Sequence, residues 1–245
     1  MKYIGSPQFS ESPNPSVGIL ITNLGTPDSP TKGALKTYLR EFLSDPRVIE
    51  IPRIVWWIIL NVIILNIRPA RSAEAYSTVW TEEGSPLLVH TKNQAKGLNK
   101  ALSSLYGEEI IVHFGMRYGK PNIESAIKQL ISAGIQKLLV LPLYPQYSGP
   151  TTGSTFDAVA KDFVKRRWIP ETRFVSSYYD HPSYIEAIAS QIENHRSKHG
   201  ESDMLIFSYH GEPQSYREAG DPYFQQCLKT SELLAKRLAL KEDKY

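Results

Sequence analysis

The sequence predicts an α/β protein built on parallel sheets, because stretches of strand and helix character alternate along the chain. Apolar runs of strand length are followed by turn formers and then by apolar residues at helical spacing. Several of these runs are hydrophobic throughout, which is typical of strands buried on both faces of a parallel sheet. Regular alternation favours a doubly wound sheet with right-handed crossovers.

The first part of the chain carries three expected strands and three expected helices. They are a strand over residues 17–24, a helix over 34–42, a strand over 110–116, a helix over 123–131, a strand over 137–143 and a helix over 156–164. The turn formers at residues 25–30 separate the first pair, and Gly134 supplies a C-terminal stop for the second helix.

The second part repeats the pattern on a smaller scale. A strand is expected over residues 172–179, a helix opened by Pro182 over 182–192, a strand over 203–209 and a helix over 224–231. Residues 168–171 form the best linker, so we expect a first domain at 17–170, preceded by an arm at 1–16, and a second domain at 171–245. Two strands and two helices are too few to cover a second sheet, so we expect this domain to be incomplete here.

Composition narrows the class of protein. The 245 residues are 41% hydrophobic and 22% charged, as in a soluble globular protein. A net charge of +3 is too small to indicate a nucleic-acid partner. The single cysteine, Cys227, excludes an internal disulfide and any four-cysteine metal site made by this chain alone. No signal-peptide core is found near Met1, and these features together favour the cytoplasm.

The most informative candidate is His210, which follows the apolar run at residues 203–209. A buried parallel strand would deliver this imidazole to the carboxyl end of a sheet, where open α/β sheets bind their ligands. Gly211 permits a sharp turn and Pro213 stiffens the loop, so the side chain would lie on a rigid edge. A structural role for a lone histidine remains the alternative.

Three further loops should meet the His210 loop at the same edge: residues 24–29, 115–118 and 144–154. Arg117 suits a carboxylate through its paired donors, and Tyr118 offers a ring face and a hydroxyl. An exposed arginine at a strand end is the alternative for Arg117. In the loop that begins at Tyr144, helix capping explains the Ser and Thr content as well as anion binding does.

Residues 54–67 are the most apolar segment and contain the pair Trp56-Trp57. The run is shorter than the ~20 residues of a spanning helix. A buried core helix is one interpretation. The other is an exposed lip that dips into a bilayer or covers a flat apolar ligand, which the flanking Arg53, Arg68 and Arg71 favour.

Four motifs in these loops carry a resemblance to a known family. They are Asn23-Leu24-Gly25-Thr26-Pro27, Tyr144-Pro145-Gln146-Tyr147-Ser148 with Thr151-Thr152-Gly153-Ser154, Ser208-Tyr209-His210-Gly211, and Gly220-Asp221-Pro222-Tyr223. In order and spacing they strongly resemble ferrochelatase, which inserts ferrous iron into protoporphyrin IX to form protohaem, the last step of haem biosynthesis. Residues 42–47 and 84–87 resemble the Gram-negative bacterial branch.

The resemblance implies a fold and a set of roles. It implies two Rossmann-like, chelatase-type domains with a porphyrin cleft between them and a hydrophobic lip at residues 50–70. His210 matches the active-site histidine, as metal ligand or as acceptor of a pyrrole proton. Leu24, Arg117, Tyr118 and Tyr144 match substrate-binding positions. An imidazole with a pKa of about 6.5 can take a proton at neutral pH, and it can also bind Fe²⁺.

Two departures from the family pattern affect what we expect. Animal members hold a [2Fe–2S] cluster, and one of its cysteines aligns with Gly149, so no such cluster is expected here. The family's essential cleft glutamate lies C-terminal to anything in this chain. We therefore expect this 245-residue chain to be a fragment that is inactive by itself.

Three functions remain open from the sequence. The first is a lyase that metallates a porphyrin, including relatives that use coproporphyrin or cobalt, and the second is a non-catalytic porphyrin- or haem-binding protein. The third is a generic two-domain binding protein, which the motifs disfavour. The resemblance implies protoporphyrin IX and Fe²⁺ as substrates, no permanently bound cofactor, and peripheral contact with the inner membrane through residues 50–70.

Overall fold

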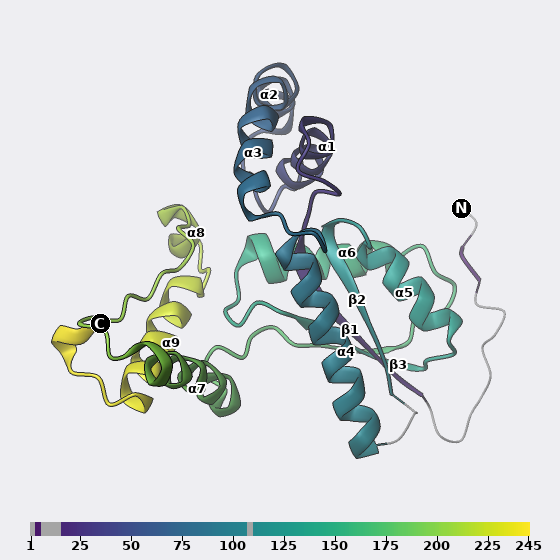
Figure 1. Cartoon of the computed structure of the whole chain (residues 1–245). Coiled ribbons are helices and arrows are strands. Elements are labelled where there is room, and N and C mark those ends of the chain that lie inside the picture. Colours follow the sequence, from purple (N-terminus) through teal and green to yellow (C-terminus); the bar gives the residue numbers. More distant parts are fainter. Residues whose placement is uncertain (1–2, 6–15, 107–109) are drawn as a thin grey trace. The chain divides into compact units, whose positions relative to one another are not determined.

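The described part of the chain forms two compact units, seen as ribbons in Figure 1. A computed structural model describes residues 3–5, 16–106 and 110–245. The first unit comprises the described residues up to Leu143 together with Gly149–Val175, and the second comprises Tyr144–Ser148 together with Ser176–Tyr245. The short segment Tyr144–Ser148 therefore packs with the second unit although both of its neighbours belong to the first.

A four-stranded parallel sheet forms the centre of the first unit. Its strands are β1 (Val17–Thr26), β2 (Ile110–Gly119), β3 (Lys137–Pro142) and β4 (Glu171–Phe174), in the order β2-β1-β3-β4. The predicted parallel sheet is confirmed. β4 is shorter than the run expected at residues 172–179, because its pairing with β3 ends at Val140 and Phe174.

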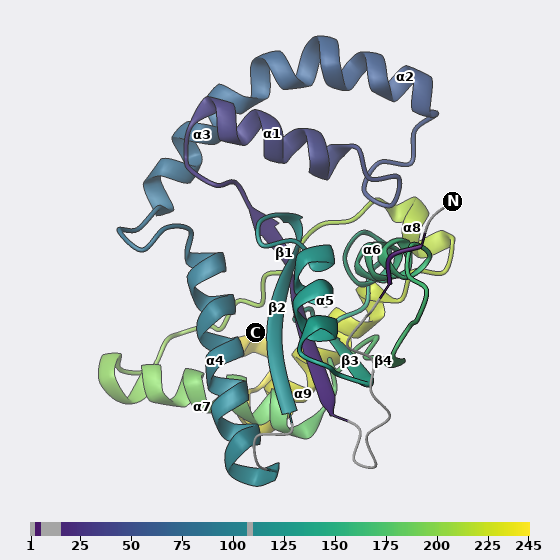
Figure 2. The same ribbon diagram turned by 90° about the vertical axis from the view of Figure 1, so that its right-hand side faces the viewer.

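Helices cover both faces of this sheet, as Figure 2 shows. α4 (Pro86–Tyr106) packs on one face, against Ile19 and Ile21 of β1. α5 (Ile123–Ser132) and α6 (Ser154–Phe163) pack on the other face, against Leu20. Successive residues of β1 therefore serve opposite layers of the core, and this explains why its consecutive residues Ile19, Leu20 and Ile21 are all apolar.

A helical layer between β1 and α4 in the sequence contains the predicted lip, residues 50–70. It consists of α1 (Lys32–Leu43), α2 (Arg53–Ile58), the π-helix η1 (Ile59–Ile64) and α3 (Leu65–Val79), and α1 lies beside α3 in both views. Trp56, Leu60 and Leu65 are buried against α1, and the Trp56 Nε1–H donates to the Leu43 carbonyl oxygen at 2.6 Å. The next side chain, Trp57, is 63% exposed.

The apolar segment therefore has a buried side and an exposed side. The exposed apolar residues are Ile54, Val55, Trp57, Ile58, Val62, Ile63 and Ile67. By length and composition alone, the continuous helix Arg53–Val79 could cross a membrane. An exposed apolar face of this size is typical of a surface that meets a ligand, a lipid or another protein.

The second unit is helical in its described residues. It contains α7 (Pro182–His199), α8 (Gln214–Glu218), α9 (Tyr223–Arg237) and the short 3₁₀ helix η3 (Glu242–Lys244). Ile185 and Ala189 of α7 pack on Leu234 of α9. Helices opened by Pro182 and beginning near residue 224 match the sequence pattern.

The strand expected over residues 203–209 is wrong for this structure. A strand requires a hydrogen-bonded neighbour, and no segment of the described chain pairs with these residues along their length. The Leu205 N–H donates to the Lys244 carbonyl oxygen at 2.9 Å, and the Phe207 ring meets Tyr245 edge-on. This apolar run therefore lies outside any sheet of the described chain.

Candidate functional site

His210 lies in the loop between residues 203–209 and α8. Its backbone N–H donates to the Tyr223 hydroxyl at 3.2 Å, and Pro213 occupies the N-cap position of α8. The side chain is exposed, and within the described chain its ring nitrogens make no hydrogen bond. The loop is therefore held through its backbone, which leaves the imidazole available to a ligand or a proton.

A pocket of about 540 Å³ lies beside this imidazole, entirely within the second unit. Much of its wall is apolar or aromatic: Tyr209, Pro213, Tyr223, Phe224, Cys227 and Leu228. The Arg217 guanidinium carbon lies 4.3 Å from the centre of the Phe224 ring, and no described carboxylate pairs with it. The wall thus combines flat apolar surface with one cation, which suits a flat ligand that carries an anionic group.

Glu212 adds a carboxyl group to the same pocket. The buried Ser148 hydroxyl donates to Glu212 Oε1 and fixes the carboxyl against the segment Tyr144–Ser148. Burial, with help from the nearby Asp221 charge, raises the pKa of Glu212 above its usual range. The sequence reasoning gave Glu212 no role, although a carboxylate two residues after a candidate histidine was a usable signal.

Tyr223 and Cys227 line the pocket from successive turns of α9. Burial raises the pKa of Tyr223 to about 12, and burial also raises the pKa of the Cys227 thiol. Both groups are therefore protonated at neutral pH. Because the thiolate is the form that binds metal, Cys227 is a poor metal ligand in this environment.

The segment Tyr144–Ser148 is held on the second unit by several polar contacts. The Gln146 side-chain amide donates to Thr230 Oγ1 at 3.0 Å, and the Tyr147 N–H donates to Gln226 Oε1 at 2.7 Å. The Tyr178 N–H donates to the Pro145 carbonyl oxygen at 2.9 Å. Tyr144 and His210, two of the predicted site residues, thus lie in loops that are joined by the Ser148–Glu212 hydrogen bond.

Arg117 and Tyr118, at the end of β2, belong to a polar network in the first unit. The Arg117 guanidinium pairs with Asp45 through Nη2, and its Nε–H donates to Ser154 Oγ at 2.6 Å. The Tyr118 hydroxyl donates to Asp45 Oδ2 at 2.8 Å. Burial alone would raise the pKa of Asp45. Hydrogen bonds from Ser154, the Arg47 N–H and Tyr118, together with the Arg117 charge, outweigh burial and hold this pKa below its usual range.

This network ties up both side chains that the sequence offered as substrate contacts. Tyr118 is 0% exposed and meets Phe42 edge-on, with ring centres 5.1 Å apart. The fork of Arg117 already holds a carboxylate from its own chain. Their contact with a porphyrin stays a prediction. The geometry shows Tyr118 packed in the same cluster as Leu24, and Arg117 bound to Asp45. The sequence reasoning missed Asp45, whose partners are 72 and 73 residues away.

Leu24 lies at the carboxyl end of β1, half-buried against the lip cluster that contains Tyr118. The adjacent Gly25 has φ +103°, and a Cβ there would lie 1.8 Å from the Tyr118 carbonyl oxygen. Only glycine permits this approach of the two strands. The structure thus brings Leu24, Arg117 and Tyr118 together in the first unit, and Tyr144 and His210 together in the second.

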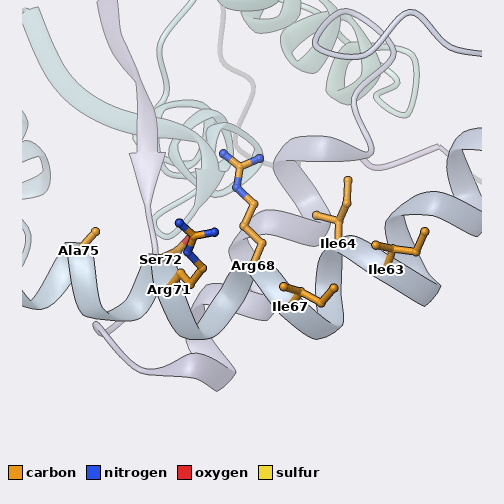
Figure 3. A pocket seen from close by; sticks show the side chains of 7 residues that line it. All are labelled: Ile63, Ile64, Ile67, Arg68, Arg71, Ser72 and Ala75. Carbon is orange, nitrogen blue, oxygen red and sulfur yellow. The ribbon is translucent and has the colours of Figure 1, made fainter.

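The lip carries a second hollow, of about 550 Å³, which Figure 3 shows from close by. Ile63, Ile64 and Ile67 line one part of it, and Arg68 and Arg71 extend their side chains beside them. Neither guanidinium has a carboxylate partner among the described residues. The lip therefore offers apolar surface next to two available cations.

Comparison with known proteins gives one consistent result. A family model described as Ferrochelatase matches residues 16–245. The ferrochelatase of Idiomarina loihiensis is 57% identical over 245 residues, which are 100% of this chain and 67% of that relative. Those of Pseudoalteromonas atlantica and Alcanivorax borkumensis are 54% and 55% identical over the whole chain, which covers 68% and 72% of their lengths. The chain spans about two thirds of the length of these relatives.

Proposed function

Because the chain belongs to the ferrochelatase family, we propose that it acts in the insertion of ferrous iron into protoporphyrin IX to form protohaem, a lyase reaction of haem biosynthesis. The observation that carries the proposal is the family match over residues 16–245, which includes His210 and its pocket. The pocket supports it, since flat apolar walls beside an imidazole suit a macrocycle.

Metal insertion requires two pyrrole N–H protons to leave before the metal lies in the plane of the ring. We propose that His210 acts here, either as the first acceptor of such a proton or as a ligand that delivers Fe²⁺. A free imidazole held by its backbone fits both roles, since general bases and metal ligands need an available nitrogen lone pair. Fe²⁺ is a substrate, and we propose no permanently bound cofactor.

Substrate contacts are proposed in each unit separately. In the first unit, Leu24 would contact the macrocycle. Arg117 and Tyr118, both hydrogen-bonded to Asp45, would support the residues packed around Leu24. In the second unit, Tyr144 and the aromatic wall around Phe224 would meet it. Arg217 is a candidate for one propionate carboxylate, because its guanidinium is stacked on Phe224 and has no described carboxylate partner.

We propose a cytoplasmic protein whose lip makes peripheral contact with the inner membrane. Its exposed face combines Trp57 and Ile63 with the cations Arg68 and Arg71. Aromatic and aliphatic side chains beside arginines are typical of helices that lie in the interface of anionic bilayers. We propose that this contact places the lip where an apolar porphyrin is available.

The relatives are about one half longer than this chain, and the resemblance implies that the family's cleft glutamate lies outside residues 1–245. We therefore propose that residues 1–245 bind porphyrin and catalyse metal insertion much more slowly than a chain of the relatives' length. A base and an opposing acid each contribute about 10²–10⁴-fold in such reactions.

The test compares this chain with a chimera that continues into the last third of the Idiomarina loihiensis relative. Zinc-protoporphyrin formation is followed by fluorescence in both, and porphyrin binding is measured by absorbance. We expect binding by both and rapid insertion by the chimera only. Failure of both to bind porphyrin would contradict the proposed function, while equal insertion rates would contradict the expected inactivity of residues 1–245.

A further inference from the structure

Two histidines lie together on the last turns of α7, outside the site described above. His195 and His199 are one helical turn apart, and their ring centres are separated by 4.4 Å with an angle of 32° between the rings. Both side chains are exposed. Residues four apart on a helix point the same way, so the two imidazoles face one region of solvent.

That region is a hollow of about 550 Å³ beside α7. Gln191, one turn before His195, lines the same hollow and adds an amide oxygen to the two imidazoles. Within the described residues no cluster of three or more His, Cys, Asp or Glu side chains could hold a metal ion. A metal here would therefore be bound by two imidazoles, with the amide or water completing the coordination.

The charges around the hollow allow a cation to bind. The last turn of a helix carries about half a unit of negative charge from its carbonyl groups. Arg196 and Glu201 both line the hollow and form an ion pair, with Nε and Oε2 3.3 Å apart, so the Glu201 carboxylate offsets part of the Arg196 charge. The Glu193 carboxylate does not compete with the imidazoles for a metal ion, because it forms an ion pair with Arg237. The remaining nearby cation is Lys198, which immediately precedes His199 in the sequence.

We propose that His195 and His199 together bind one divalent first-row transition-metal ion such as Zn²⁺. Imidazole nitrogens bind Zn²⁺ at about 2.0–2.1 Å, and two rings 4.4 Å apart reach one such point after small side-chain rotations. Imidazole prefers Zn²⁺, Cu²⁺ and Ni²⁺, binds Fe²⁺ more weakly and does not suit Mg²⁺. This site is independent of the proposed porphyrin chemistry.

The test is a titration of the 245-residue chain with Zn²⁺ by calorimetry, with Mg²⁺ as the comparison ion. We expect Zn²⁺ binding that weakens at least about tenfold in His195→Ala and in His199→Ala, because each removes one of two ligands. Co²⁺ should give a visible absorption band that the same variants lose. His90→Ala removes an exposed helical histidine elsewhere and should bind as the unaltered chain does.

A rearranged variant separates spacing from composition. Lys198→His combined with His199→Lys keeps the same residues but moves the second imidazole about 100° around the helix, and it should bind as weakly as His199→Ala. His210→Ala distinguishes this site from the proposed active site and should retain the binding event. Wild-type affinity in both His195→Ala and His199→Ala, or loss of all binding in His210→Ala, would overturn the proposal.

Discussion

At the scale of single residues, the structure separates groups that are free to react from groups that support them. His210 has an available imidazole, whereas the side chains of Arg117 and Tyr118 are hydrogen-bonded to Asp45. Sequence reasoning placed all three in one list of site residues, because residue type and position at a strand end do not reveal a partner 72 residues away. We therefore expect substitution of His210 to reduce activity and substitution of Asp45 to reduce stability.

Replacement of His210 by alanine should abolish metal insertion in the chimera while leaving the fold intact. The side chain is exposed and makes no hydrogen bond within the described chain, so its removal costs little stability. We expect a loss of about 10²-fold or more in kcat with a change in melting temperature of a few degrees at most. Near-wild-type turnover in the zinc-insertion assay would remove His210 from the mechanism.

Asp45→Asn should have the opposite profile, with a large loss of stability. The change removes the charge that balances Arg117 in a buried network, which costs about 3–5 kcal/mol when one partner is lost. The melting temperature of the variant reports this loss. Ser29→Ala, which removes only an exposed hydroxyl pair with Thr31, is the control and should melt as the unaltered chain does.

The same network predicts a pH dependence. Since the pKa of Asp45 is lower in the folded chain than in the unfolded chain, its contribution is fully present above the unfolded value of about 3.9 and is lost as pH falls through the folded value. The stability difference between the unaltered chain and Asp45→Asn, measured by urea unfolding, should therefore shrink below about pH 4. A difference independent of pH would show that the Asp45 charge does not stabilise the network.

At the scale of elements, the strands β1, β2 and β3 and the helices α1, α5, α6, α7 and α9 follow from periodicity, since each buries apolar side chains. The sequence pattern did not predict α4, and β4 is mostly exposed. The run at residues 203–209 shows the limit of that reasoning. Its composition is that of a buried strand, but a strand exists only with a paired neighbour, and pairing is a property of the whole fold. The sequence left two interpretations of residues 54–67, a core helix and an exposed lip, for a related reason. Composition does not show which side of an apolar helix is covered by the rest of the fold.

The lip supplies a matched pair of variants for this element. Trp56 is 7% exposed and hydrogen-bonded to Leu43, whereas its neighbour Trp57 is 63% exposed. Trp56→Ala should destabilise the chain by about 3–5 kcal/mol through the cavity it leaves. Trp57→Ala should leave the melting temperature nearly unchanged and weaken sedimentation with vesicles that contain anionic lipid.

Neutral vesicles provide the control for the electrostatic part of this contact, because Arg68 and Arg71 add attraction only to anionic surfaces. Binding of the chain to anionic vesicles that is indifferent to Trp57→Ala would place the contact elsewhere. A different outcome is that Trp56→Ala and Trp57→Ala both bind vesicles as the unaltered chain does, while added porphyrin quenches tryptophan fluorescence less in Trp57→Ala. The exposed face would then serve the porphyrin rather than the membrane.

At the scale of the whole molecule, the two units differ in how much core they possess. The first unit has a four-stranded sheet covered on both faces, with Leu20, Ile127 and Val140 fully buried. In its described residues the second has a small cluster of Ile185, Ala189 and Leu234, between α7 and α9. Since local stability follows buried apolar area and backbone pairing, we infer that the units open with different free energies.

Native-state hydrogen exchange should therefore show slower exchange in β1 and α5 than in α7 and α9. The amides of β1 are paired on both sides, with β2 and with β3, and exchange only when the sheet opens. His210, Glu212 and the proposed His195–His199 site all lie in the less protected unit. Added protoporphyrin should slow exchange around Tyr209–Cys227 if the pocket there binds it, and added Zn²⁺ should slow exchange at the end of α7. Equal protection of both units without ligand would mean that the small helical cluster is stabilised by contacts beyond its own core, and the stability argument would then fail.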